Sequence, residues 1–258
     1  MSVFTIISPT YNRPELLSKM IDSVLSQDFT DWELIIVDDS TNSETEKVIR
    51  KYLKDARITY LKNHKNIGAP LSRNRGLDAA TGKWITFLDD DDILYGDNIL
   101  TTVYKTINLD WPWYVFRRVG HTGENLTIIN TTLKHYNWTR DCLFGNALRG
   151  DAAHFIKKSL IGSTRNSDEM RSEWRFWYEL AKKSNFKFID LVVQKGGYLE
   201  DGLMSTYVPK MNSIYLKQHL FEVTRHIDTW KYVPKALLRI LLAYTTYYQF
   251  KQKLESEK

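Results

Sequence analysis

The sequence predicts an α/β fold with a mostly parallel central sheet flanked by helices, a mixed second half and C-terminal helices. Two observations carry this prediction. Over the first 95 residues, short apolar runs rich in β-branched residues alternate with segments of helical periodicity about 10–15 residues long. Polar side chains follow these runs directly, as expected where ligands bind beyond the carboxyl ends of parallel strands.

Four apolar runs are predicted to be buried strands, at residues 3–8, 33–37, 57–61 and 84–88. Three helices are expected between them. The first follows a cap at Asn12, has Pro14 in its first turn and runs to about residue 25. The second covers residues 43–53, and the third covers residues 70–80, before Gly82.

The second half of the chain is predicted to be mixed and to pack on the edge of the sheet. Aromatic-rich strands are expected at residues 111–119 and 126–130, followed by a helix over about residues 169–183. In this half, His154 is expected to be a buried structural histidine, with a contact to a bound ligand as the alternative.

The positive charge of the chain lies in its tail. The net charge is +5, and residues 210–258 hold nine Lys or Arg against four Asp or Glu, so the preceding residues are neutral overall. Charge placed away from the polar loops argues against a nucleic-acid groove. Residues 234–250 form an amphipathic pattern flanked by lysines, which suits a membrane surface. Docking on this chain or on a second copy, as in a homo-oligomer, is the alternative.

Composition also indicates a compartment. A single cysteine, Cys142, excludes an internal disulfide and a thiolate metal site. The sequence starts without a basic segment, and it has no run of about 18 apolar residues. These features predict a cytoplasmic protein, with peripheral contact at the inner face of the cell membrane through the basic tail.

The sharpest feature is a run of four aspartates, residues 89–92, directly after the fourth predicted strand. Adjacent carboxylates repel one another, so a folded protein needs a cation or a strong field to hold them together. In extended backbone alternate residues share a side, so Asp89 is expected beside Asp91 and away from Asp92. Such oxygen ligands suit Mg²⁺ or Mn²⁺. A solvated, helix-capping turn is the alternative.

Polar loops after other predicted strands suit a nucleotide. The segment around Tyr11 offers backbone groups and an aromatic face on which a base stacks, and Asp39 offers an acceptor for a base or sugar. Arg73, in the third predicted helix, is suited to a diphosphate. Neither GxGxxG nor GxxxxGK[ST] occurs, so the sequence lacks a dehydrogenase or kinase fingerprint.

Four segments within about 90 residues carry a family resemblance. They are ISPTYNR at 7–13, VDDS at 37–40, NIG at 66–68 with SRNRG at 72–76, and FLDDDD at 87–92. Together they resemble glycosyltransferase family 2, enzymes of the GT-A fold that use nucleotide-diphospho-sugars. The resemblance implies an inverting transferase with a DxD-type metal site that uses Mn²⁺ or Mg²⁺.

The resemblance also implies roles for single residues. Asp91 is the expected direct metal ligand, with Asp89 beside it. The residues expected to contact the donor nucleotide are Pro9, Thr10, Tyr11, Arg13, Asp38, Asp39, Asn66, Gly68, Arg73, Asp89 and Asp90.

The catalytic base of the family lies in a Glu-Asp-Trp type segment that opens a helix in the second half. Residues 172–181, SEWRFWYELA, resemble it, and Glu173 stands where an aspartate is expected. Glu173 is therefore the expected base. The alternatives are Asp168 or Glu169 as the base, and a surface ion pair of Glu173 with Arg175 or Lys183.

These features predict that residues 1–209 form a GT-A catalytic domain followed by a basic helical extension, 210–258. Residues 1–95 are the nucleotide-sugar-binding half, and residues 96–209 are the acceptor-side half. The expected reaction moves a sugar from a nucleotide-diphospho-sugar, with UDP as the expected nucleotide, to a hydroxyl of a carbohydrate or lipid-linked saccharide in polysaccharide or glycolipid synthesis.

Two alternatives stay open. An inactive nucleotide-sugar-binding protein is one, because a glutamate replaces the expected aspartate. A nucleotidyltransferase is the other, although such enzymes usually carry a basic, glycine-rich loop that this sequence lacks. No nucleic-acid partner is expected.

Overall fold

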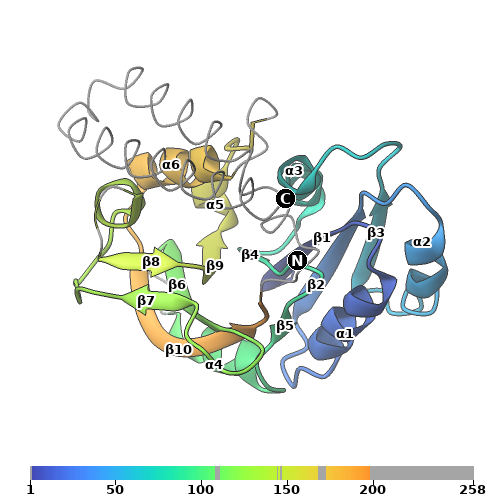
Figure 1. The fold of residues 1–258 in the computed structure, drawn as a ribbon, viewed down its shortest axis with the longest axis horizontal. Coiled ribbons are helices and arrows are strands. Elements are labelled where there is room, and N and C mark those ends of the chain that lie inside the picture. Colours follow the sequence, from blue (N-terminus) through green and yellow to red (C-terminus); the bar gives the residue numbers. More distant parts are fainter. Residues whose placement is uncertain (1, 108–110, 144, 146, 168–172, 198–258) are drawn as a thin grey trace, which may run out of the picture. The chain divides into compact units, whose positions relative to one another are not determined.

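An eight-stranded sheet organises the described part of the chain, which in this computed structural model comprises residues 2–107, 111–143, 145, 147–167 and 173–197 (Figure 1). The strand order is β3-β2-β1-β4-β9-β6-β10-β5. The strands are β1 (Phe4–Thr10), β2 (Trp32–Asp38), β3 (Ile58–Lys62), β4 (Trp84–Phe87), β5 (Ile93–Leu94), β6 (Trp113–Val119), β9 (Ala152–Lys157) and β10 (Lys187–Lys195).

Six of these strands run in the same direction. Strand β1 is parallel to β2 and β4, and β2 is parallel to β3. Strand β9 is antiparallel to both β4 and β6, so β6 again runs with β4, and β10 is parallel to β6. Strand β5 pairs antiparallel with β10. The predicted mostly parallel sheet is confirmed, and the carboxyl ends of β1–β4, β6 and β10 meet at one edge.

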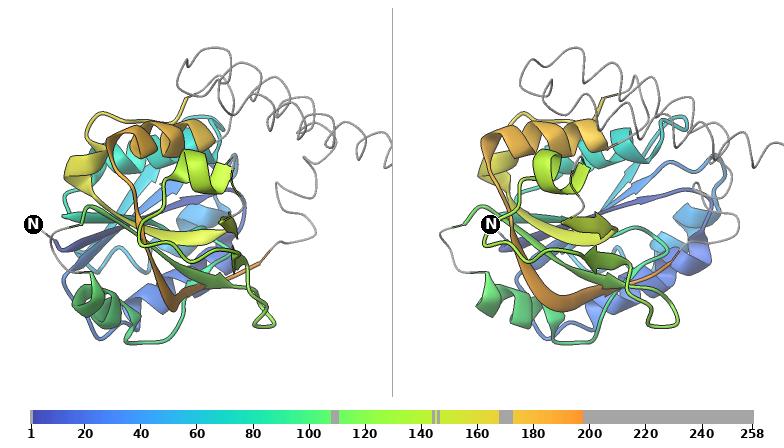
Figure 2. Two further views of the ribbon diagram at one scale, coloured as in Figure 1. Left: turned by 90° about the vertical axis from the view of Figure 1, so that its left-hand side faces the viewer. Right: turned by 60° about the vertical axis from the view of Figure 1, so that its left-hand side comes forward.

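Helices cover both faces of this sheet, as Figure 2 shows. Helices α1, α2 and α4 pack on one face, and α3, α5 and α6 pack on the other together with a π-helix, η1. The remaining elements are a two-stranded sheet of β7 and β8. The bounds are α1 (Pro14–Leu25), α2 (Glu44–Ile49), α3 (Ala69–Ala79), α4 (Ile99–Thr106), α5 (Lys158–Ile161), α6 (Trp174–Lys183), η1 (Trp138–Leu143), β7 (Thr127–Ile129) and β8 (Leu148–Gly150).

The first helices differ from the expected ones at their ends. Arg13, not Asn12, is the N-cap residue of α1. Asn12 instead adopts a left-handed conformation, with φ of 54°, and donates its N–H to Ser40 Oγ at 2.8 Å. Asparagine tolerates this conformation better than most residues, so it joins two loops of the carboxyl edge rather than capping. Helix α2 is shorter than the expected 43–53, because the chain turns after residue 49.

The second half lies at the edge of the predicted four-stranded sheet, as expected, and it extends the sheet there by strand pairing. Strand β9 pairs with β4 and brings β6 and β10 into the same sheet. Its side chains enter both cores, Phe155 on the α1 face and Ile156 on the α3 face, which accounts for its central position. The sequence analysis did not identify β9 or β10.

Helix α3 lies unusually close to β1 because of one glycine. A Cβ at Gly76 would lie 2.3 Å from Ile7 Cγ2, which excludes any larger residue without movement. This contact fixes the helix that carries Arg73, one turn earlier.

Several expectations lie outside the described residues. They concern the basic extension 210–258 and the alternative bases Asp168 and Glu169. Within the described residues, no helix combines the length and the apolar character that a membrane span requires.

Candidate active site

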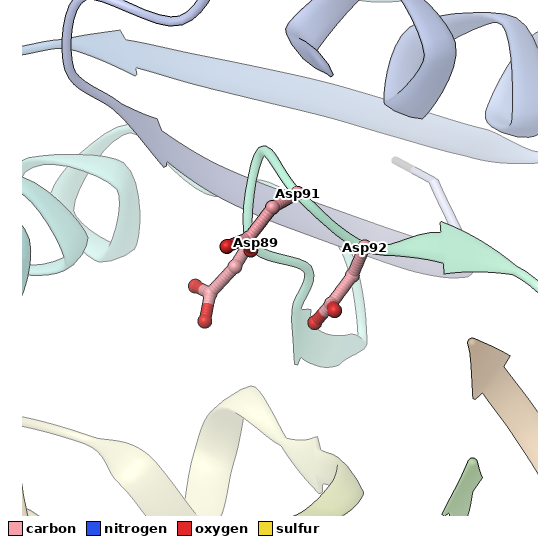
Figure 3. A group of neighbouring side chains, drawn as sticks. All are labelled: Asp89, Asp91 and Asp92. Carbon is pink, nitrogen blue, oxygen red and sulfur yellow. The ribbon is translucent and has the colours of Figure 1, made fainter. Parts of the chain in front are cut away.

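The four aspartates after β4 form a turn, not the expected extended segment. The N–H of Asp92 donates to the carbonyl of Asp89 at 3.1 Å, which folds the chain back. As a result, carboxylate oxygens of Asp89, Asp91 and Asp92 lie within 4.8 Å of one another, and Figure 3 shows the three side chains on this loop. The expectation that Asp92 lies away from Asp89 is wrong, because it assumed extended backbone. We call these three residues the acidic triad.

Asp90, the fourth aspartate of the run, is not part of the acidic triad and instead contacts the end of β1. Its Oδ2 accepts hydrogen bonds from Thr10 Oγ1 at 2.7 Å and from the Tyr11 N–H at 3.4 Å. Asp90 is 6% exposed, and burial raises its pKa to about 6. It therefore joins the loops after β1 and β4, while the exposed Tyr11 ring stays free to contact a ligand.

The triad suits a hard divalent cation by its donor set. Three carboxylates on one short turn offer oxygen ligands only, which Mg²⁺ and Mn²⁺ prefer. Gly196, at the end of β10, makes room for the turn, because a Cβ there would lie 1.5 Å from Asp92 Oδ1. The cation would be held by Asp89, Asp91 and Asp92.

Three arginines compensate the charge of the aspartates. Arg13 Nη1 lies 3.1 Å from Asp91 Oδ2 and 3.5 Å from Asp90 Oδ1. Arg73 pairs with Asp89, and Arg118 pairs with Asp92. The guanidinium groups come from the loop after β1, from α3 and from β6. The turn is therefore held by cations from three separate elements.

These arginines separate the pKa values of the triad. Burial raises the pKa of Asp92 to about 8, with the Arg118 charge opposing it. Burial and the Asp89 charge also raise the pKa of Asp91. At Asp89 burial acts in the same direction, but the charges of Arg73 and Arg118 outweigh it and lower the pKa. Asp89 is thus the triad member held most firmly as a carboxylate.

Arg118 was not among the predicted site residues, although the sequence carries a signal for it. Tyr114, Phe116 and Arg118 alternate along β6 and so share one face of the strand. An arginine that continues a buried face requires a carboxylate partner. Arg118 has a side chain 14% exposed and lies between Asp92 and Asp151, the latter at 3.5 Å.

The two aspartates after β2 serve mainly to hold loops. Asp38 is fully buried and accepts hydrogen bonds from Tyr60 Oη at 2.6 Å, Lys62 Nζ at 2.8 Å and the Ser40 N–H at 2.8 Å. Its carboxylate is therefore engaged by contacts within the chain.

Asp39 closes the loop that leads from β3 to α3. It accepts hydrogen bonds from Asn63 Nδ2 at 2.7 Å, the Ile67 N–H at 2.8 Å and the Gly68 N–H at 2.7 Å. Gly68 has φ of 87°, which favours glycine, and it precedes α3 as its N-cap residue. Asn66 lies exposed in this loop, and Pro9 is buried within β1.

Glu173 lies at the start of α6, directly beside Arg73. The Arg73 guanidinium contacts Glu173 through Nη1 and Asp89 through Nη2. Its side chain is only 8% exposed and lies over the Phe87 ring, with 5.7 Å from Cζ to the ring centroid. The structure thus brings the predicted base, the predicted diphosphate-binding arginine and the acidic triad together.

His154 is a structural histidine beneath α6. Its Nδ1 accepts a hydrogen bond from Trp113 Nε1 at 3.1 Å, and its ring stacks on Trp177 at 4.1 Å. Burial lowers its pKa to about 3, so the ring is neutral at physiological pH. Trp177 lies one helical turn after Glu173, so this aromatic stack supports the start of α6.

The depressed pKa of His154 predicts a pH dependence of stability. The folded state disfavours the protonated ring, whereas the unfolded chain takes up this proton near pH 6.5. The free energy of unfolding is therefore unaffected by protonation of His154 above pH 6.5, and it falls as the pH drops from 6.5 toward 3. Between pH 6.5 and 4.5, the wild-type free energy of unfolding should fall by up to about 1.4 kcal/mol per pH unit more than that of His154→Gln. Urea unfolding of both proteins measures this, and equal slopes would contradict it.

The close packing of Gly196 against Asp92 predicts an effect on metal binding. The Gly196→Ala substitution should displace Asp92 and weaken Mn²⁺ binding by at least about tenfold, because the alanine Cβ occupies the position of its carboxylate. Gly123→Ala is a matched control, since a Cβ there meets nothing within 4 Å, although its φ of 92° adds local strain. Electron paramagnetic resonance of free Mn²⁺ measures both. Unchanged affinity in Gly196→Ala would show that Asp92 is dispensable.

Comparison with known proteins identifies the family. The model of the family described as Glycosyl transferase family 2 matches residues 5–160. A UDP-Glc:alpha-D-GlcNAc-diphosphoundecaprenol beta-1,3-glucosyltransferase of Escherichia coli is 40% identical over 188 residues, which cover 72% of each chain. A GalNAc(5)-diNAcBac-PP-undecaprenol beta-1,3-glucosyltransferase of Campylobacter jejuni is 32% identical over 194 residues. That match covers 72% of this chain and 62% of the relative, less than two thirds of its length.

Solved structures share the fold at low sequence identity. S. aureus TarS in complex with UDP-GlcNAc aligns with a TM-score of 0.71 and 16% identity, over 95% of this chain and 73% of that one. A mannosyltransferase from Pyrobaculum calidifontis, in complex with GDP-Man and Mn²⁺, aligns with a TM-score of 0.60 and 14% identity, over 98% and 79%. These similarities confirm the predicted fold. The family match confirms the resemblance of the four sequence segments, and the chain belongs to glycosyl transferase family 2.

Proposed function

We propose that this chain is an inverting, metal-dependent glycosyltransferase that moves a sugar from a UDP-sugar to a hydroxyl of a lipid-linked saccharide. One observation carries the proposal: Arg73 joins the acidic triad to Glu173 at the carboxyl edge of the sheet. A transferase needs a cationic site for the departing diphosphate and a carboxylate for the acceptor proton, and this edge offers both.

The residues divide the chemistry between them. An acceptor hydroxyl is a weak nucleophile at neutral pH, so Glu173 takes its proton as the new bond forms. Arg73, and Arg13 beside Asp91, bind oxygens of the diphosphate through charge-assisted hydrogen bonds. A Mn²⁺ or Mg²⁺ ion held by Asp89, Asp91 and Asp92 would supply positive charge for the leaving group. A base opposite the leaving group gives inversion at the anomeric carbon.

The nucleotide lies, in this proposal, over the loops after β1 and β2. Tyr11 offers the exposed ring for stacking, and Asp39 and Gly68 shape the neighbouring loop. Contacts of the nucleotide with Pro9, Thr10, Asn66 and Asp90 belong to the same proposal. Asp38 would contribute indirectly, through its hydrogen bond from Lys62.

The comparisons support the choice of substrates. TarS has been solved with UDP and with UDP-GlcNAc, and both relatives named above carry undecaprenol-linked acceptors in their descriptions. We therefore propose a UDP-sugar donor and an acceptor on a polyprenyl diphosphate. A peripheral membrane contact through residues 210–258 would serve such an acceptor, and it stays a prediction because those residues lie outside the described part.

The test is a transfer assay on the purified chain. Nucleotide-sugars with each common base are incubated with a synthetic polyprenyl-diphosphate-linked sugar and Mn²⁺, and nucleoside diphosphate release and product mass are measured. We expect product with a UDP-sugar and none after chelation of the metal. Tight nucleotide-sugar binding without product on any acceptor would instead favour the inactive binding protein.

A further inference from the structure

We infer that Arg73 is a latch that holds the base against the acidic triad until the donor binds. The inference rests on the proposed function and concerns the order of events at that site. In the structure, the Arg73 guanidinium donates hydrogen bonds to both carboxylates, from Nη1 to Glu173 and from Nη2 to Asp89. We call this pair of contacts the Arg73 latch.

The geometry of the latch leaves no room for the reacting sugar. Two oxygens bonded to Nη1 and Nη2 of one guanidinium lie at most about 7 Å apart, given normal hydrogen-bond lengths and the fixed directions of the N–H groups. Asp89 is one of the three residues that would hold the ion, so the acceptor oxygen, the anomeric carbon, the leaving oxygen and the ion must fit between Glu173 and Asp89. That chain of contacts spans roughly 10 Å. The latch must therefore open before the donor sugar reaches its reactive position.

The donor itself supplies the means of opening. Arg73 is nearly buried, so its guanidinium requires anionic partners at all times. A diphosphate offers a bidentate partner of higher charge than either carboxylate. When it engages Arg73, Glu173 loses its counter-ion and becomes available to an acceptor hydroxyl. Glu173 is therefore released to act as a base only after the donor engages Arg73.

Contacts between described residues hold α3 and the backbone at Asn166 in place near the latch. Helix α3 is fixed on β1 by the close approach of Gly76 to Ile7. The chain before α6 is tied to α3 by reciprocal bonds, Asn74 Nδ2 to the Asn166 carbonyl at 2.9 Å and the Asn166 N–H to Asn74 Oδ1 at 2.7 Å. Glu173 has a side chain 31% exposed, so it has space to turn away from Arg73.

The latch predicts that removing the base charge improves donor binding. Glu173 competes with the diphosphate for Arg73, so Glu173→Gln should bind UDP with Mn²⁺ about tenfold more tightly than the wild type, measured by calorimetry. Glu179→Gln removes the same charge from the same helix, where Glu179 pairs with Lys182 and not with Arg73. That control should leave the affinity unchanged.

A double-mutant cycle separates the latch from general electrostatics. In an Arg73→Gln background, the Glu173→Gln change should alter the UDP affinity by less than about twofold, because the competition requires the guanidinium. If Arg73→Gln does not fold, as near-ultraviolet circular dichroism would show, Arg73→Met takes its place, since its uncharged side chain pairs with neither the carboxylates nor the diphosphate.

The outcomes keep the latch and the proposed function apart. Wild-type binding of UDP with Mn²⁺ but no tightening in Glu173→Gln would overturn the latch alone. Equal tightening with and without Arg73 would also overturn it, because a plain charge effect would then suffice. Failure of every protein to bind any nucleoside diphosphate would remove the proposed function and the latch together.

Discussion

Replacing Glu173 with glutamine should lower the rate of sugar transfer by about 10²–10⁴-fold, the range that a general base contributes. Glutamine keeps the size and shape of the side chain, but its amide cannot take the proton of the acceptor hydroxyl. The loss should fall on kcat, because the amide leaves the acidic triad intact. Initial rates of UDP release over a range of donor and acceptor concentrations measure both constants.

Two further variants make this result specific to the base. Glu173→Asp restores the aspartate that the family resemblance predicts here, and it should retain measurable transfer because the carboxylate persists. Glu179→Gln also removes a carboxylate, but among the described ion pairs Glu179 pairs with Lys182. This variant should transfer sugar at the wild-type rate. A Glu173→Gln protein with undiminished kcat would assign the base elsewhere, with Asp168 and Glu169 the next candidates.

The second large effect is expected at Asp91. Asp91→Asn should weaken Mn²⁺ binding by more than about 100-fold, since changes to residues that only support metal ligands already cost 10–100-fold. The loss arises because an amide is a poorer ligand than a carboxylate, and because the Arg13 charge beside the site is then balanced by Asp90 alone, at 3.5 Å. Transfer activity should fall in parallel and recover in part at high Mn²⁺ concentration.

Asp97→Asn provides the matched control for the metal site. Asp97 lies in the exposed loop before α4 and outside the acidic triad, and its substitution removes the same charge. Its Mn²⁺ affinity should equal that of the wild type. If both variants bound Mn²⁺ normally, the triad would be an acidic turn held by arginines alone, and the metal proposal would be withdrawn.

The sequence predicted those parts of the fold that depend on local pattern. The four parallel strands and the helices between them follow from apolar runs and helical periodicity, and each was found within a few residues. The acidic run was placed correctly at the carboxyl edge because it directly follows a strand. Arg73 was proposed from its guanidinium chemistry and Glu173 from the family resemblance, and nothing in the local pattern relates two residues a hundred positions apart.

The features that were missed depend on tertiary contacts. The turn at Asp89–Asp92 is set by one backbone hydrogen bond and by three arginines from separate elements, so four identical letters could not reveal it. Strand β9 is a six-residue segment whose alternation, AAHFIK, is weak without its neighbours. Gly196 matters only because β10 ends against Asp92, which the sequence does not encode locally.

The central claim is that the carboxyl edge of the sheet binds a metal-associated nucleoside diphosphate. Calorimetric titration of the wild-type chain with UDP, GDP, ADP and CDP, with and without Mn²⁺, tests it most directly. We expect UDP to bind in preference to the others, and we expect that binding to depend on the metal. Binding of no nucleotide under either condition would contradict the claim, whatever the fold.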